Sequence, residues 1–123
     1  MNNPDTTVPS LKLLVLKNRQ VDKLLAFYQS LGIAFSQEQH GKGPVHHAGQ
    51  VGGTVLEIYP LPDDACTVDQ STRLGFAVGN LEHVVENLRA SGTPVTSPPQ
   101  KTAWGYRAVV QDTDGRAVEL YQG

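Results

Sequence analysis

Two carboxylates, Glu57 and Glu119, occupy matching places in the two halves of this 123-residue sequence. Each stands two residues before a tyrosine, Tyr59 or Tyr121. Strand alternation places the apolar neighbours of each glutamate on one face of a sheet and the glutamate itself on the other. A carboxylate inside a protein needs a cationic partner, a metal ion or water. The two glutamates are therefore the first candidates for chemistry.

Arg73 is the cation that we expect to meet these carboxylates. It stands at the start of a predicted strand in the second half, and we expect it to form a cluster with Glu57 and Glu119. Two interpretations remain open. The cluster is either a structural ion pair that ties the halves together, or an anchor in which Arg73 binds an anionic ligand group and a carboxylate takes a donor or cation.

The histidines offer a second kind of chemistry. His46 and His47 are adjacent on a predicted strand, so their side chains point to opposite faces and at most one reaches a shared cavity. His46 would there replace a metal ligand or act as a general base beside Glu57. The alternative is a pair of half-buried sheet histidines. His40, beside a glycine-rich turn, and His83, on the exposed side of a helix, are not predicted to be ligands.

Four aromatic residues lie near the inferred mouth of the cavity: Trp104, Tyr106, Tyr59 and Tyr121. Pockets for small organic molecules are usually lined in this way, with few polar anchors. The same side chains would serve equally well as core residues or as a dimer interface, and both interpretations remain open.

The elements that position these residues occur twice along the chain. In the first half we expect a strand, a helix and three strands, over residues 11–17, 21–31, 33–39, 45–51 and 54–59. In the second half we expect a strand over 72–78, a helix that Asn80 caps and Ser91-Gly92 ends, an extended piece over 94–96, a loop over 97–100, and a hairpin of strands 104–111 and 116–121.

The two halves match residue by residue within their helices. Leu24, Leu25 and Tyr28 recur as Val84, Val85 and Leu88, and a glycine follows each helix at the same distance. A matched helix stripe, helix stop and closing hairpin indicate an internal duplication. We therefore predict an α+β fold of two βαβββ modules with mixed sheets forming a cavity. It is one domain over residues 1–123, with modules at about 11–60 and 72–122 and a connector at 60–71.

Composition excludes several classes of partner. The net charge of −2 provides no basic field for nucleic acid, and the longest apolar runs are too short to span a membrane. The N-terminal residues are polar and lack the features of a signal peptide. The single cysteine, Cys66, forms no intrachain disulfide and suits a reducing cytoplasm; with no base near it in sequence, it is not predicted to be a nucleophile.

Two segments resemble a known family. Leu24-Leu25-Ala26-Phe27-Tyr28, with Leu31-Gly32, and the closing run from Asp112 to Leu120 are similar to the glyoxalase, bleomycin-resistance and extradiol-dioxygenase superfamily, also called vicinal oxygen chelate proteins. The resemblance covers nearly the whole chain, from about residue 11 to residue 122. It implies the cavity-forming fold and a homodimer, because paired chains in the family often complete the cavities.

The resemblance also implies a metal site with one ligand on the first and last strand of each module. The last-strand positions fall on Glu57 and Glu119, and the first-strand positions on Leu13 and Arg73. Leucine has no donor atom, and a guanidinium does not deprotonate in proteins. Arg73 would also repel an ion there. We therefore expect no four-ligand site and no cofactor, with a divalent metal on Glu57, Glu119 and His46 as the alternative.

These observations favour a cytoplasmic, metal-independent small-molecule-binding protein, one that would sequester a toxic compound. The alternative is a metal-dependent lyase, isomerase or dioxygenase that uses Glu57 and Glu119. A third interpretation is a structural or partner-binding subunit. Because one fold hosts many functions, the sequence leaves open whether the protein is an enzyme and what its ligand is.

Overall fold

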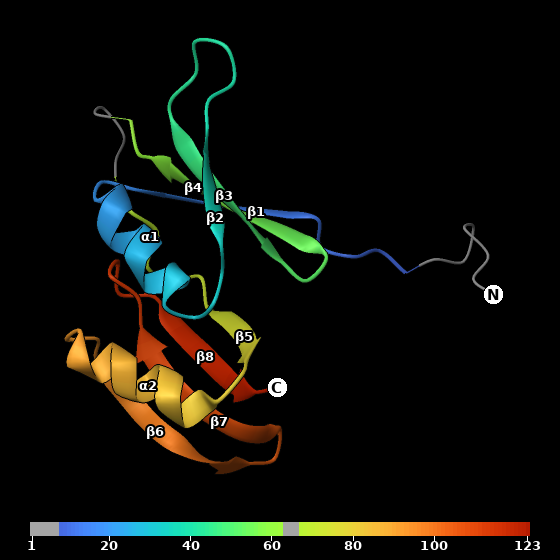
Figure 1. Ribbon diagram of the computed structural model, residues 1–123, viewed down its shortest axis with the longest axis vertical. Helices are drawn as coiled ribbons and strands as arrows, with labels where there is room; N and C mark the ends of the chain where they lie inside the picture. The colour runs from blue at the N-terminus through green and yellow to red at the C-terminus, as the bar shows by residue number, and fades with distance from the viewer. Residues whose placement is uncertain (1–7, 63–66) are drawn as a thin grey trace.

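The computed structural model describes residues 8–62 and 67–123. Figure 1 shows two modules, each a four-stranded sheet with one helix, and both helices on the same side of the molecule. The N-terminal residues 1–7 and Cys66, both interpreted from the sequence above, lie outside the described residues. None of the helices in the described ranges is long and apolar enough to cross a membrane.

The first module contains β1 (Leu13–Asn18), α1 (Val21–Gln29), β2 (Phe35–Glu38), β3 (His46–Val51) and β4 (Thr54–Pro60). Its sheet has the order β1-β4-β3-β2. The β1–β4 pair is parallel and the other pairs are antiparallel. Parallel strands need a long crossover, and here the crossover contains α1.

The second module contains β5 (Leu74–Val78), α2 (Leu81–Ala90), β6 (Val95–Thr102), β7 (Gly105–Gln111) and β8 (Ala117–Gln122). Its sheet has the order β5-β8-β7-β6, again with a parallel first pair. The topology of the first module is thus repeated. The predicted α+β fold of two βαβββ modules is confirmed.

The helix boundaries follow the predicted signals closely. The side chain of Asn80 accepts a hydrogen bond from the backbone N–H of His83 and caps α2. Gly32 and Gly92 both have positive φ values, as left-handed helix stops require. The first helix ends at Gln29, slightly earlier than predicted.

The loop predicted over 97–100 is wrong. Pro98 and Pro99 lie inside β6, which runs without interruption from Val95 to Thr102. Proline has no backbone N–H and is confined to sheet edges and bulges. The structure meets both conditions, since β6 is the edge strand and its pairing with β7 shifts register between Val95 and Gln100.

The helix-facing sides of the two sheets contribute to one apolar cluster. Leu56 and Ile58 of β4 and Val118 and Leu120 of β8 are buried in it, as strand alternation predicted. The cluster includes residues of both helices. A core shared by both modules is what a single domain requires.

Polar side chains also join the modules. Tyr28 of α1 contacts the ring of Phe76 and donates a hydrogen bond to Asp112, just after β7. Asp112 and Asp114 both form ion pairs with Arg116, whose side chain is 1% exposed. The described modules are therefore joined on their helix sides.

Candidate functional site

Each sheet has a face opposite its helix, which we call its open face. On the first sheet, strand register places Glu57 beside Val15 and Tyr59 beside Lys17. His47 is paired with the core residue Ile58, so it faces the helix. His46, one residue earlier, belongs to the open face, as the opposite orientation of the two histidines predicted.

On the second open face, three side chains donate hydrogen bonds to Glu119. Arg73 Nε lies 2.5 Å from Oε2, Arg107 Nη1 lies 3.1 Å from Oε1, and the Tyr121 hydroxyl lies 2.5 Å from the same Oε1. The hydrogen bond from Tyr121, followed by the bond and charge of Arg73, lowers the pKa of Glu119 against the opposing effect of desolvation. Two guanidiniums around one carboxylate leave a net positive charge on this face.

Arg107 is a member of this cluster that sequence reasoning missed. It lies on β7 opposite Tyr121, and its guanidinium carbon is 5.8 Å from the centroid of the Trp104 ring. Trp104 itself is 75% exposed. Strand alternation along β7 could have indicated this position. It places Arg107 on the same face as Val109, the register partner of Glu119.

On the first open face, Glu57 belongs to a different cluster. Nε2 of His46 lies 3.7 Å from Glu57 Oε2 and 3.4 Å from Glu38 Oε1, and the histidine side chain is 1% exposed. The ring of Tyr59 stacks on His46 with centroids 4.0 Å apart and 7° between the planes. His46 therefore does reach the open face beside Glu57, in a position fixed by packing.

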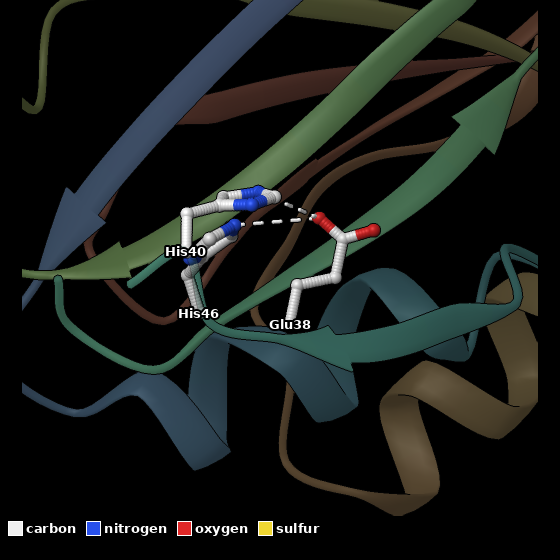
Figure 2. A group of neighbouring side chains, drawn as sticks. All are labelled: Glu38, His40 and His46. Atoms are coloured by element: carbon white, nitrogen blue, oxygen red, sulfur yellow. Dashed lines mark ion pairs between the residues drawn. The ribbon is translucent and has the colours of Figure 1, made fainter. Parts of the chain in front are cut away.

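His40 joins the same cluster, contrary to the prediction that it would not be a ligand candidate. Its Nε2 lies 3.6 Å from Glu38 Oε1, the atom that His46 also approaches, and Figure 2 shows both imidazoles directed at that oxygen. Glu38 was not singled out either. Finding it required the hairpin register, which pairs Glu38 with His46 across β2 and β3.

The predicted cluster of Arg73, Glu57 and Glu119 is thus divided. Arg73 pairs with Glu119, but among the residues that the structure describes no ion pair joins Arg73 to Glu57. Glu57 and Glu119 lie on different sheets, and each is paired within its own cluster.

The metal site that the family resemblance implies does not fit these residues. Both carboxylate oxygens of Glu119 already accept hydrogen bonds from donors. On β1, neither Leu13 nor Val15, the register partner of Glu57, has a donor atom. Arg73 places a permanent positive charge against Glu119.

A cleft of about 400 Å³ lies between the modules. It is formed by β1, the β3–β4 hairpin and β5, and most of its lining is apolar: Leu14, Val51, Leu56, Leu74, Gly75 and Phe76 belong to it. Gly75 is also the register partner of Glu119. At Gly75 the cleft therefore reaches β5, the strand that pairs with the one carrying Glu119.

Comparison with solved structures gives the same fold. TnmS3, an antibiotic binding protein from Streptomyces sp. CB03234, is 21% identical, with a TM-score of 0.73 over 95% of this chain and 98% of its own. TioX from Micromonospora sp. ML1 is 17% identical, with a TM-score of 0.65 over 93% and 98%. A glyoxalase-related enzyme from Fulvimarina pelagi is 18% identical, with a TM-score of 0.73 over 94% and 89%. At these identities the likeness is one of fold alone.

Comparison of sequences identifies the family. An uncharacterized protein of Mycolicibacterium smegmatis is 24% identical over 111 residues, which are 90% of this chain and 91% of that protein. Residues 10–120 match the sequence profile of one family, which is nearly the whole of both modules. The chain therefore belongs to the Glyoxalase/Bleomycin resistance protein/Dioxygenase superfamily.

Proposed function

We propose that this protein binds and sequesters a small organic molecule with an anionic group, at the second open face and the cleft beside it. The observation that carries the proposal is the cluster in which Arg73 and Arg107 share one carboxylate, Glu119. Its net positive charge favours an anion. The Arg73 side chain is 54% exposed, so its remaining N–H donors are open to a carboxylate or phosphate.

The apolar part of such a ligand has two surfaces available. The cleft volume of about 400 Å³ falls within the range of small-molecule pockets, roughly 300 to 1,000 Å³. On the other side of Arg107, the exposed Trp104 ring offers a face on which a planar group can stack. TnmS3, an antibiotic binding protein with the same fold, supports this class of function.

We also propose that the protein is a cytoplasmic homodimer in which each copy completes the cavity of the other. Leu13, on the first open face, is 51% exposed, and Trp104, beside the second, is 75% exposed. A second copy that sets its first open face against this second one would cover both. The single cysteine is compatible with a reducing compartment.

A metal-dependent lyase, isomerase or dioxygenase has less support. It would need Glu57 and Glu119 as joint ligands, whereas both oxygens of Glu119 accept hydrogen bonds from Arg73, Arg107 and Tyr121.

The only tryptophan of the chain provides the test. A panel of aromatic carboxylates is titrated into the purified protein while Trp104 fluorescence is recorded. We expect saturable quenching by at least one compound, unchanged by a chelator. Arg73→Ala should weaken it at least tenfold, because a charge-assisted contact is lost. Arg89→Ala, on the exposed side of α2, is the matched control. Equal affinities for Arg73→Ala and the parent protein would overturn the proposal.

A further inference from the structure

Three side chains converge at one end of the first sheet, in a cluster that shares no residue with the ligand site proposed above. Glu38 ends β2, His40 lies in the following turn, and His46 begins β3. Their ligand atoms all lie within 4.8 Å of one another. The two Nε2 atoms are 3.4 and 3.6 Å from the same glutamate oxygen (Figure 2). A tetrahedral ion with bonds of about 2.1 Å holds its ligand atoms about 3.4 Å apart, so the spacing fits an ion.

The hydrogen bonding of His46 determines which ring nitrogen is free. Nδ1 lies 3.2 Å from the carbonyl oxygen of Pro44, which can only accept, so Nδ1 carries a hydrogen. In the neutral ring, Nε2 then presents a lone pair to the carboxylates of Glu38 and Glu57. A cation placed between three acceptors that face one another around a buried side chain would relieve their mutual repulsion.

The hydroxyl of Tyr59 is not placed to donate a hydrogen to the Nε2 lone pair of His46. It lies 3.3 Å from His46 Nε2, but the two rings are stacked with only 7° between their planes. The hydroxyl therefore lies over the imidazole, whereas the Nε2 lone pair lies in the imidazole plane.

The turn that holds His40 has a defined backbone. Gly41 has a φ of 58°, a left-handed conformation that suits glycine. The N–H of Gly43 donates to the His40 carbonyl over 3.0 Å, and Gln39 Nε2 donates to the Gly43 carbonyl over 2.9 Å. These contacts present His40, 75% exposed, beside the buried His46, with ring centroids 5.1 Å apart.

We propose that Glu38, His40 and His46 bind a divalent transition-metal ion, with Zn²⁺ as the best match. Two imidazoles and one carboxylate are a ligand set of zinc that leaves a fourth position for water or a ligand oxygen. The Nδ1–H bond from His46 to a backbone carbonyl is the outer-shell contact that commonly orients a metal-binding histidine. The Glu57 carboxylate adds negative charge beside the ion.

The test is calorimetric titration of Zn²⁺ into the untagged, chelator-stripped full chain. We expect one ion per chain. His40→Ala and Glu38→Gln should each weaken binding at least tenfold, and both keep the buried His46 in place. His83→Ala removes an exposed histidine from α2, where its ring contacts Asn87, and should leave the affinity unchanged.

Co²⁺ absorption adds a readout of coordination. We expect visible bands of a four-coordinate ion in the parent protein and in His83→Ala, and their loss in His40→Ala. If no saturable Zn²⁺ binding is found, the proposal is overturned. Equal affinities for His40→Ala, Glu38→Gln and the parent protein would overturn it as well. Neither result bears on ligand quenching of Trp104, so the two proposals fail separately.

Discussion

The hydroxyl of Tyr28 in α1 donates a 2.7 Å hydrogen bond to Oδ2 of Asp112, joining the two modules through a buried contact. Asp112 also accepts from Arg116 Nη1 at 3.1 Å and from the backbone N–H groups of Asp114 and Arg116. The Asp112 carboxylate thus holds the β7–β8 turn through its backbone hydrogen bonds and accepts a hydrogen bond from α1 of the other module. Packing and polar contacts therefore determine together how the modules meet.

Replacing Tyr28 with phenylalanine tests this contact. The change keeps the ring and its packing but deprives a buried carboxylate of one donor, so we expect a loss of about 1.5 to 3 kcal/mol in the free energy of unfolding. Urea denaturation followed by circular dichroism measures it. Tyr106→Phe removes an exposed hydroxyl that donates to Glu82, and should change stability by less than about 0.5 kcal/mol. Equal effects of the two changes would contradict a junction role for Tyr28.

The same tyrosine should make the fold sensitive to alkali. Burial, together with the charge of Asp112 and the hydrogen bond to it, raises the pKa of Tyr28 well above its usual range. Above about pH 10 an unfolded tyrosine loses its proton while folded Tyr28 keeps it. The unfolded state then binds fewer protons, so stability falls as the pH rises.

We therefore expect the melting temperature of the parent protein to fall more steeply between about pH 9.5 and 11 than that of Tyr28→Phe. Tyr59 and Tyr106, whose pKa values are also raised, are present in both proteins and cancel in the comparison. If the melting temperatures of the two proteins fall equally with rising pH, Tyr28 does not contribute to the loss of stability in alkali.

The internal repeat predicted the fold because it consists of helix and strand patterns, which are set by residues close together in the sequence. The helix stripe containing Tyr28 and the two final strands with Glu57 and Glu119 depend on periods of 3.6 and 2 residues within short segments. The error at Pro98 and Pro99 arose because proline disfavours strands in general, whereas β6 is an edge strand with shifted register. Whether a strand lies at the edge of its sheet is known only once the order of the strands is known.

The candidate sites were harder to predict because each depends on contacts between segments. Strand alternation placed Glu57 and Glu119 on the open faces correctly. It does not show which sheet faces lie against one another in the folded protein. Arg73 was paired with Glu119 correctly. The cluster of Glu38, His40 and His46 was missed, because a turn of uncertain length separates these residues and only the β2–β3 register brings them together.

Gly49 provides a test of packing in the first sheet. A Cβ atom added there would lie 2.7 Å from Ile33 Cγ2 and 2.9 Å from Phe35 Cδ2, closer than carbon atoms approach. Gly49→Ala should therefore destabilise the protein by about 1 to 3 kcal/mol, as overpacking does. At Gly53, in the next turn, an added Cβ would meet nothing within 4 Å, so Gly53→Ala is the control. Urea denaturation of both variants measures the difference; equal stabilities would contradict the close contact.

The proposed dimer leads to a prediction about Leu13. This side chain is 51% exposed on the first open face, where a second copy would cover it, so Leu13→Asp would bury an unpaired charge in the interface. By light scattering after gel filtration we expect twice the mass of one chain for the parent protein and a monomer for the variant. Val8→Asp changes an apolar residue that is 80% exposed and precedes the sheet, and it should remain dimeric. A parent protein that is monomeric at all concentrations would refute the dimer, and a dimeric Leu13→Asp would move the interface away from this face.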